Sequence, residues 1–171
     1  MTVTATLSAR LEAAQTGPND YLDTFAPILA GTQKLVDGVA ANQADLIFAD
    51  QRAVADGAND DIDLAGVLTD AFGVSITFAE LVGLLIINKP ISGAANTTDL
   101  TIGLGTNPFL GFLGGTTPTL GPIKPGGVFM IFAGDAAGIG TVGAAASDIL
   151  RVANSAGAVA NYQIAIIGRS A

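Results

Sequence analysis

The chain has 171 residues, enough for one domain with a hydrophobic core, and its 22 glycines and 13% charged residues favour strands and turns over solvated helices. It contains no cysteine and no histidine, which excludes disulfides, ordinary zinc sites and catalysis by a histidine base. The net charge of −8 resides in residues 1–80, which hold twelve acidic and three basic side chains, and this field disfavours nucleic acid as a partner.

The N-terminal residues 2–13 alternate between polar side chains at even numbers and apolar side chains at odd numbers. This period of two predicts a strand with one solvated face. Beyond a turn at residues 17–20, glycine and proline interrupt the periodicity as far as residue 42. Tyr21 and Phe25 belong to an apolar patch that a short helix would also explain, but Pro27 favours an extended arm. We expect this irregular arm to bury Tyr21 and Phe25 on a partner.

Short strands separated by turns are predicted from residue 45 onward. Residues 45–54 and 61–64 are predicted to form a hairpin with an acidic turn at 56–59. The apolar run 81–88 is too short to span a membrane and indicates a central strand covered on both faces. The period of two in 159–167 places Tyr162, Ile164 and Ile166 on the inner face. The other predicted strands are 74–78, 100–104, 128–132 and 147–153.

These elements predict an all-β chain. Eight or nine short strands without a long helix are typical of a β-sandwich or a jelly-roll-like fold. We expect two regions, an N-terminal strand and irregular arm at residues 1–42 and a β-sandwich domain at residues 43–171. Three prolines interrupt the longest uncharged stretch, so we expect no membrane span.

The long loop at residues 105–122 carries four large apolar side chains, Phe109, Leu110, Phe112 and Leu113. One interpretation is that the loop folds back and closes one end of the sandwich. The other is that it packs against a neighbouring chain, as contiguous exposed apolar patches usually do. The sequence leaves both interpretations open.

The segment 138–143, Gly-Ile-Gly-Thr-Val-Gly, matches the glycine pattern of dinucleotide-binding loops. No acidic residue follows Asp148 to bind a ribose, and one βαβ unit at the end of the chain cannot form a doubly wound sheet. The pattern is expected by chance in a glycine-rich chain. We therefore expect no cofactor.

The acidic segment 56–63 supplies the oxygen ligands that calcium takes, but its spacing does not match an EF-hand loop. We expect a solvated turn and no metal, with calcium as the alternative. Asp61 and Asp63 share one strand face and could form the carboxylate pair of a glycosidase. The chain has no tryptophan and two tyrosines, so the aromatic platforms that usually bind sugars are scarce. We expect no enzymatic activity.

Several segments resemble a group of small tailed-bacteriophage proteins, and the likeness covers about residues 38–168. The segments that carry it are ANQADLIFADQR (41–52), DLAGVLTDAFG (63–73), PGGVF (125–129), SDILRVANS (147–155) and the closing residues 162–168. The resemblance implies a virion component encoded with the head genes, and specifically a capsid decoration or cement protein.

From this resemblance we expect a non-enzymatic trimer on the outer surface of the phage head, assembled in the host cytoplasm. It would bind the major capsid protein and stabilise contacts between capsomers. The residues expected at contacts are Tyr21, Phe25, Phe109, Leu110, Phe112 and Leu113. One alternative is a tail or head fibre module that binds a host receptor through loops such as 89–97, and another is a small glycan-active enzyme that uses Asp61 and Asp63.

Overall fold

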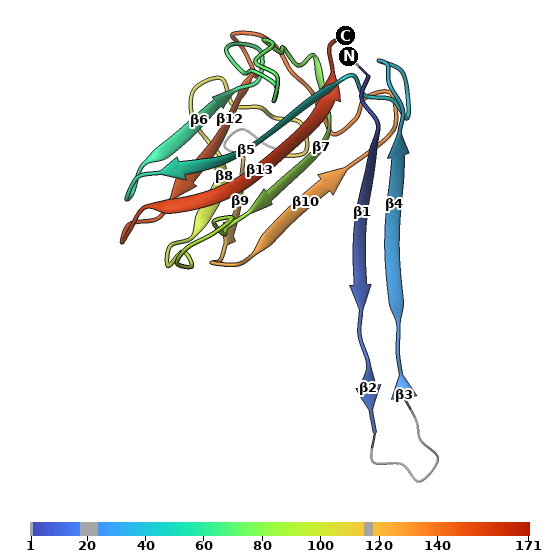
Figure 1. The fold of residues 1–171 in the computed structure, drawn as a ribbon. Coiled ribbons are helices and arrows are strands. Elements are labelled where there is room, and N and C mark those ends of the chain that lie inside the picture. Colours follow the sequence, from blue (N-terminus) through green and yellow to red (C-terminus); the bar gives the residue numbers. More distant parts are fainter. Residues whose placement is uncertain (1, 18–23, 115–117) are drawn as a thin grey trace.

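The structure of the chain, a computed structural model, describes residues 2–17, 24–114 and 118–171. Every regular element in these residues is a strand, so the prediction of an all-β chain is confirmed. The strands form a body of two facing sheets and an arm that extends away from it (Figure 1). The strand order of the two sheets does not establish a jelly roll.

The first sheet has the strand order β10-β7-β13-β5, and all of its neighbours are antiparallel. A short fifth strand, β11, pairs with β7 beyond the end of β10. The bounds of these strands are β5 Leu46–Val54, β7 Glu80–Ile87, β10 Val128–Phe132, β11 Gly140–Thr141 and β13 Ala160–Arg169.

The second sheet has the order β6-β12-β8-β9 and lies behind the first in Figure 1. Its strands are β6 Asn59–Asp63, β8 Leu100–Gly103, β9 Thr119–Ile123 and β12 Ile149–Asn154. The sequence prediction of one loop over residues 105–122 missed the start of β9. Pro122 made a strand improbable there, but β9 is an edge strand, and an edge tolerates a proline because one side of it needs no ladder hydrogen bond.

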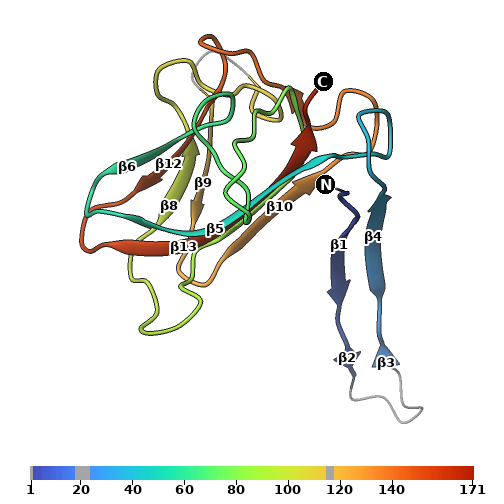
Figure 2. The same ribbon diagram turned by 45° about the horizontal axis from the view of Figure 1, so that its top comes forward.

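The two sheets face each other (Figure 2), and the buried side chains between them form one hydrophobic core. The β7 side chains Leu84 and Ile86 contribute to it and are at most 2% exposed. Because β7 lies between β10 and β13, the prediction that 81–88 is a central strand is confirmed, but the predicted cover on both faces is wrong in part, since Leu85 and Ile87 on the outer face are only half-buried. Tyr162, Ile164 and Ile166 of β13 also lie in the core, as their period of two predicted.

The predicted hairpin of residues 45–54 and 61–64 is wrong. Residues 46–54 form β5 of the first sheet, whereas β6 belongs to the second, so the chain crosses between the layers in the turn at 55–58. Phe48 on β5 and Ile62 on β6 both face the core, and they reach it from opposite sides. The predicted strand 74–78 is also absent; a single bridge between Thr69 and Ser75 occurs instead.

The arm is a long antiparallel ribbon rather than an irregular segment. Strand β1 Ala5–Glu12, predicted by its alternation, pairs with β4 Ile28–Leu35, and further out β2 Gln15–Thr16 pairs with β3 Thr24–Phe25. Pro27 lies between β3 and β4, where it interrupts neither ladder. The sequence prediction missed β4 because its two faces do not alternate clearly in polarity.

The base of the arm is attached to the body by a small second core. Val3 and Leu35 pack there with Ala44, Val82 and Ile167, and all five side chains are at most 7% exposed. Since Val82 and Ile167 belong to the first sheet, the arm starts on the outer face of that sheet before it extends away (Figures 1 and 2).

Candidate functional site

The carboxylates of the acidic segment 56–63 are engaged by groups of the same chain. Asp60 accepts hydrogen bonds from Arg52 Nε at 2.6 Å and from the Tyr162 hydroxyl at 2.7 Å, which ties the two sheets together. Asp56 accepts one from the Gly157 amide at 2.7 Å. Burial and the neighbouring Asp60 raise the pKa of Tyr162, so its hydroxyl stays a donor. No cluster of three or more acidic side chains able to hold a metal occurs in the described part of the chain.

The two candidate glycosidase carboxylates also have partners in the chain. Asp61 lies directly opposite Arg151 in the sheet ladder, and both of its oxygens accept guanidinium hydrogen bonds at 2.6 Å. Asp63 accepts a hydrogen bond from the Ala65 amide at 3.1 Å. Hydrogen bonds from Arg151 lower the pKa of Asp61, whereas a general acid needs a raised pKa.

This pair predicts a small acid sensitivity. Because the folded pKa of Asp61 is lowered, the pair stabilises the fold above the ordinary value of 3.8, and this contribution is lost as the pH falls through the lowered pKa. Asp61 is 44% exposed, so we expect Asp61→Asn to lower the free energy of unfolding by about 0.5–1 kcal/mol at pH 7 and by almost nothing at pH 2. Urea titrations at both pH values measure this, with Glu12→Gln as the control. An equal loss at both pH values would contradict an ionic origin.

The dinucleotide-like segment 138–143 does not lie at a strand-to-helix turn. Residues 140–141 form β11, and the chain then runs through a turn into β12 without a helix. Gly138 has a φ of +58°, and a Cβ at this position would collide with the Leu81 carbonyl oxygen. The Ile139 amide next to it donates to that carbonyl at 2.7 Å. These glycines therefore allow the segment to pack closely against β7.

The apolar loop contributes mainly to the core of its own chain. Phe109 and Leu113 are buried, at 1% and 6% exposed, and Phe112 is half-buried with its ring 5.5 Å from that of Phe129. This geometry favours the interpretation in which the loop closes one end of the body. Of the four residues predicted to contact a partner, only Leu110 is exposed, at 43%.

The other two predicted contact residues belong to the arm. Phe25 is 67% exposed on β3, and Tyr21 lies outside the described residues. The arm has one apolar face, because residues opposite each other in an antiparallel ladder share a face. We call this face the arm stripe; it consists of Ala5, Leu7, Ala9, Leu11, Leu29, Gly31, Gln33 and Leu35.

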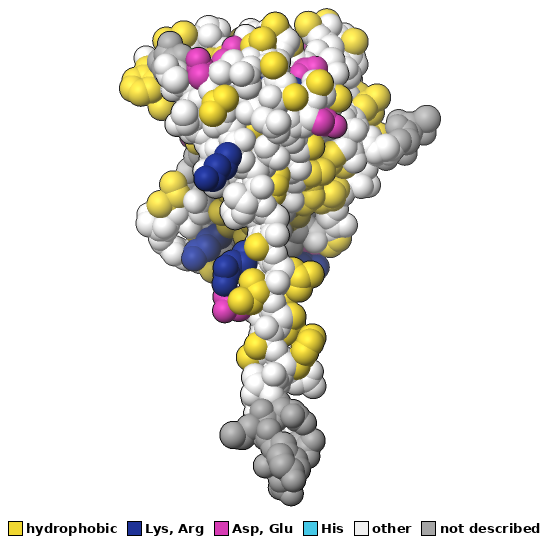
Figure 3. Space-filling view, turned by 90° about the vertical axis from the view of Figure 1, so that its right-hand side faces the viewer, with side chains coloured by type: hydrophobic (Ala, Val, Ile, Leu, Met, Phe, Trp, Pro, Cys, Tyr) yellow, Lys and Arg dark blue, Asp and Glu magenta, His cyan; other side chains and the backbone are white. Residues whose placement is uncertain are grey.

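The arm stripe is exposed over its outer half. Leu11 and Leu29, which are cross-strand partners, are 57% and 62% exposed. Figure 3 shows hydrophobic side chains along the arm and a hydrophobic patch on the body beside it. An amphipathic ribbon with an uncovered apolar face is typical of a surface that binds another protein.

The outer face of the first sheet is a second apolar surface, which the base of the arm covers at one end only and which sequence reasoning missed. Outward-facing residues of four strands align in three rows across it, and only two of the twelve are polar. The rows, in the order β5, β13, β7, β10, are Ile47, Ile167, Gly83, Phe132; then Ala49, Ala165, Leu85, Met130; then Gln51, Gln163, Ile87, Val128. The four strands are distant in sequence, so no local pattern could reveal this surface.

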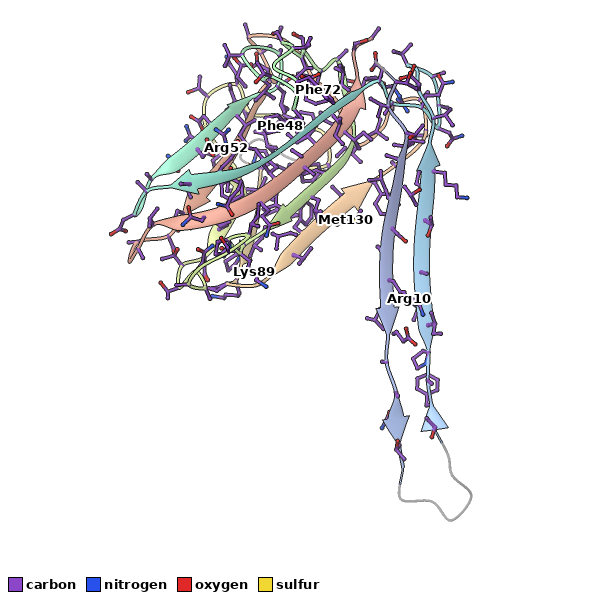
Figure 4. All side chains as sticks on the ribbon, viewed as in Figure 1. Arg10, Phe48, Arg52, Phe72, Lys89 and Met130 are labelled. Carbon is purple, nitrogen blue, oxygen red and sulfur yellow. The ribbon has the colours of Figure 1, made fainter. Side chains whose placement is uncertain are left out.

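A third apolar surface lies on the loop between β6 and β7. Val67 is 84% exposed, Phe72 78% and Val74 55%. The Asp70 carboxylate accepts hydrogen bonds from the amides of Phe72 and Val74, both at 2.9 Å, and so fixes the turn that presents Phe72. Sequence analysis did not predict the exposure of Phe72. Figure 4 places Phe72 at the top of the body, whereas the arm extends in the opposite direction.

Comparison of the chain with protein-family models, curated proteins and solved structures finds no match. Among the residues that the structure describes, no helix is long and apolar enough to cross a membrane.

Proposed function

We propose that the chain is a structural component of a tailed-bacteriophage virion, a capsid decoration protein. It binds the outer surface of the head and stabilises contacts between capsomers of the major capsid protein. The segments quoted above from residues 41–168 support the phage assignment by resemblance. Binding that favours the assembled shell stabilises it by mass action.

The observation that carries a binding role is the placement of the exposed hydrophobic side chains. Two groups of them lie on projecting elements at opposite ends of the molecule, Phe72 on its loop and Leu11, Leu29 and Phe25 on the arm (Figure 4). Exposed aromatic residues on a rigid turn are typical anchors of protein interfaces. A protein with contact surfaces at both ends is suited to bridge neighbouring subunits.

The rival functions have weaker support from the same geometry. The carboxylates that a glycan-active enzyme would use are bound by Arg151 and by a backbone amide. The loop 89–97, proposed for a receptor-binding fibre module, is fastened to the first sheet. The Ile91 amide donates to Gln51 Oε1 at 2.6 Å, and Gln163 Nε2 donates to the Lys89 carbonyl at 2.9 Å.

A binding experiment with empty heads tests the proposal. We expect the purified chain to co-sediment with heads assembled from the major capsid protein encoded beside it. Because truncating a central aromatic residue of an interface costs about 2 kcal/mol or more, we expect Phe72→Asp to weaken binding about 30-fold.

The matched control is Val159→Asp, since Val159 is 53% exposed but lies in the turn between β12 and β13. Circular dichroism and the Tm check that both variants fold. Failure of the unchanged chain to bind heads, or electron-microscopy density for it only at the tail, would reject the decoration role.

A further inference from the structure

The outer face of the first sheet is hollowed into a trough. Its floor is formed by the small side chains Ala49 and Ala165, and Leu85 and Ile87 of β7 line one side. Ile91, which is 70% exposed, also lines the main hollow, whose volume is about 550 Å³. We call this surface the sheet trough. Its floor is apolar and smooth, because no large side chain rises from the two central alanines.

The arm of the same chain already packs at the other end of this face. A second hollow of about 250 Å³ is lined by Ala5 and Leu7 of the arm together with Leu85, Met130 and Ala165 of the sheet. Leu7 lies over Gly83, where a Cβ would come within 3.0 Å of the Leu7 side chain. The first two residues of the arm stripe therefore already contact the same sheet face that the sheet trough occupies.

The outer part of the arm stripe extends away from the body, and its cross-strand pair Leu11 and Leu29 is 57% and 62% exposed. The arm is longer than the first sheet is wide. Strands rise about 3.3 Å per residue, so residues 5–16 of the arm span about 40 Å, whereas the four strands of the first sheet, about 4.8 Å apart, span a width of about 15 Å. An isolated two-stranded ribbon is marginally stable in water at best. The outer half of the arm therefore needs a surface to cover it. The base of the arm packs on the body in a way that directs the arm away from the sheet trough of its own chain (Figure 1).

A second copy of the chain supplies such a surface with the right chemistry. Its sheet trough is mostly apolar, with Gln51 and Gln163 in its lining, and the adjoining end of the same sheet face packs against Ala5 and Leu7 of an arm stripe. Charge does not oppose the contact. The paired strands of the arm carry Arg10 and Lys34 against Glu12, whereas residues 36–171 carry twelve acidic and five basic side chains.

We propose that the arm stripe of one copy packs into the sheet trough of a second copy, so that exchanged arms hold the oligomer together. Each junction joins two different surfaces, the arm of one copy and the sheet trough of the next. The oligomer closes into a ring when the arm of the last copy packs into the sheet trough of the first. The polar face of the ribbon, which carries Ser8, Arg10 and Thr32, remains in solvent. This inference does not depend on the phage assignment.

Light scattering coupled to size-exclusion chromatography of the full chain, from about 1 to 100 µM, tests the inference. We expect an oligomer for the unchanged chain and a monomer for either Ala49→Arg in the sheet trough or Leu11→Arg in the arm stripe. Both sites are exposed in the single chain, so the fold should tolerate the change. Ser8→Arg on the opposite face of the ribbon is the matched control and should leave the oligomer intact.

Mixing the two monomeric variants gives the sharper result. Ala49→Arg retains a working arm and Leu11→Arg retains a working trough, so together they should form a one-to-one heterodimer through a single junction. A monomeric unchanged chain at 100 µM would overturn the proposal. So would an oligomer that survives both substitutions, or a mixture that stays monomeric.

Cross-linking distinguishes a second copy from the same chain as the occupant. The chain has no cysteine, so Leu11→Cys with Ala49→Cys introduces the only two thiols. A short bismaleimide should join these thiols between copies, giving dimers and larger species on a denaturing gel, whereas Ser8→Cys with Ala49→Cys should not. A link within one chain would overturn the proposed exchange. If the unchanged chain forms the oligomer but does not bind heads, the decoration role alone is rejected.

Discussion

Replacing Arg169 with alanine is expected to lower the free energy of unfolding by about 3–5 kcal/mol, because it leaves the Glu80 carboxylate, which is only 22% exposed, and three backbone carbonyls without their donor. The Arg169 side chain is fully buried. It donates to Glu80 Oε2 at 2.8 Å and to the carbonyls of Gln43 at 3.1 Å, Ala136 at 3.0 Å and Asp135 at 2.7 Å. This one guanidinium joins β13 to β7, to the segment before β5 and to the loop after β10.

Urea denaturation at a concentration where the chain is monomeric measures this loss. The matched control is Arg10→Ala, because Arg10 pairs with Glu12 on the exposed arm and both side chains are more than half exposed. An exposed pair of this kind contributes less than about 0.5 kcal/mol. A loss below about 1 kcal/mol for Arg169→Ala would show that water replaces the guanidinium, and would contradict its structural role.

Replacing Ile86 with alanine is expected to cost about 2–5 kcal/mol, because it opens a cavity in the main core. Ile86 has no exposed surface and lies on the central strand, between its ladder partners Ile164 and Phe129. The neighbouring strands are held on both sides by hydrogen bonds, so the backbone has little freedom to collapse into the space.

The same urea titrations measure the loss, with Ile28→Ala as the control. Ile28 is 57% exposed on the polar face of the arm, and its truncation removes the same atoms without opening a cavity. Surface changes of this kind stay within about 0.5 kcal/mol. Equal losses for the two variants would contradict the placement of Ile86 in the core.

The two proposals give different binding partners to different surfaces of the molecule. The Phe72 loop is assigned to the shell, and the arm stripe and sheet trough to other copies of the chain. Phe72→Asp should therefore weaken head binding about 30-fold without changing the oligomer. Because an oligomer multiplies weak contacts through effective concentration, Ala49→Arg should also reduce head binding, although Ala49 belongs to β5 and not to the Phe72 loop.

Local alternation was enough to predict several elements. The strict period of two in residues 2–13 predicted β1, and the alternation in 159–167 predicted which side chains of β13 face the core. The continuous apolar run 81–88 predicted the buried strand β7. These predictions hold because the side chains of a strand alternate strictly between its two faces, so one short segment carries the whole signal.

Tertiary contacts decided the rest. Whether β5 and β6 form a hairpin or cross between layers depends on which sheet each can join, and nothing in residues 45–64 specifies that choice. Phe109 and Phe72 have similar sequence surroundings, yet the first is buried and the second is exposed. The outer face of the first sheet combines residues from four strands spread over residues 47–167, so it exists only once the ladder registers are set. The sequence by itself determined the strands with a strong local pattern, β1, β7 and β13, because that pattern depends on neighbouring residues. The tertiary structure decided which apolar faces remain uncovered, because that depends on the pairing of distant segments.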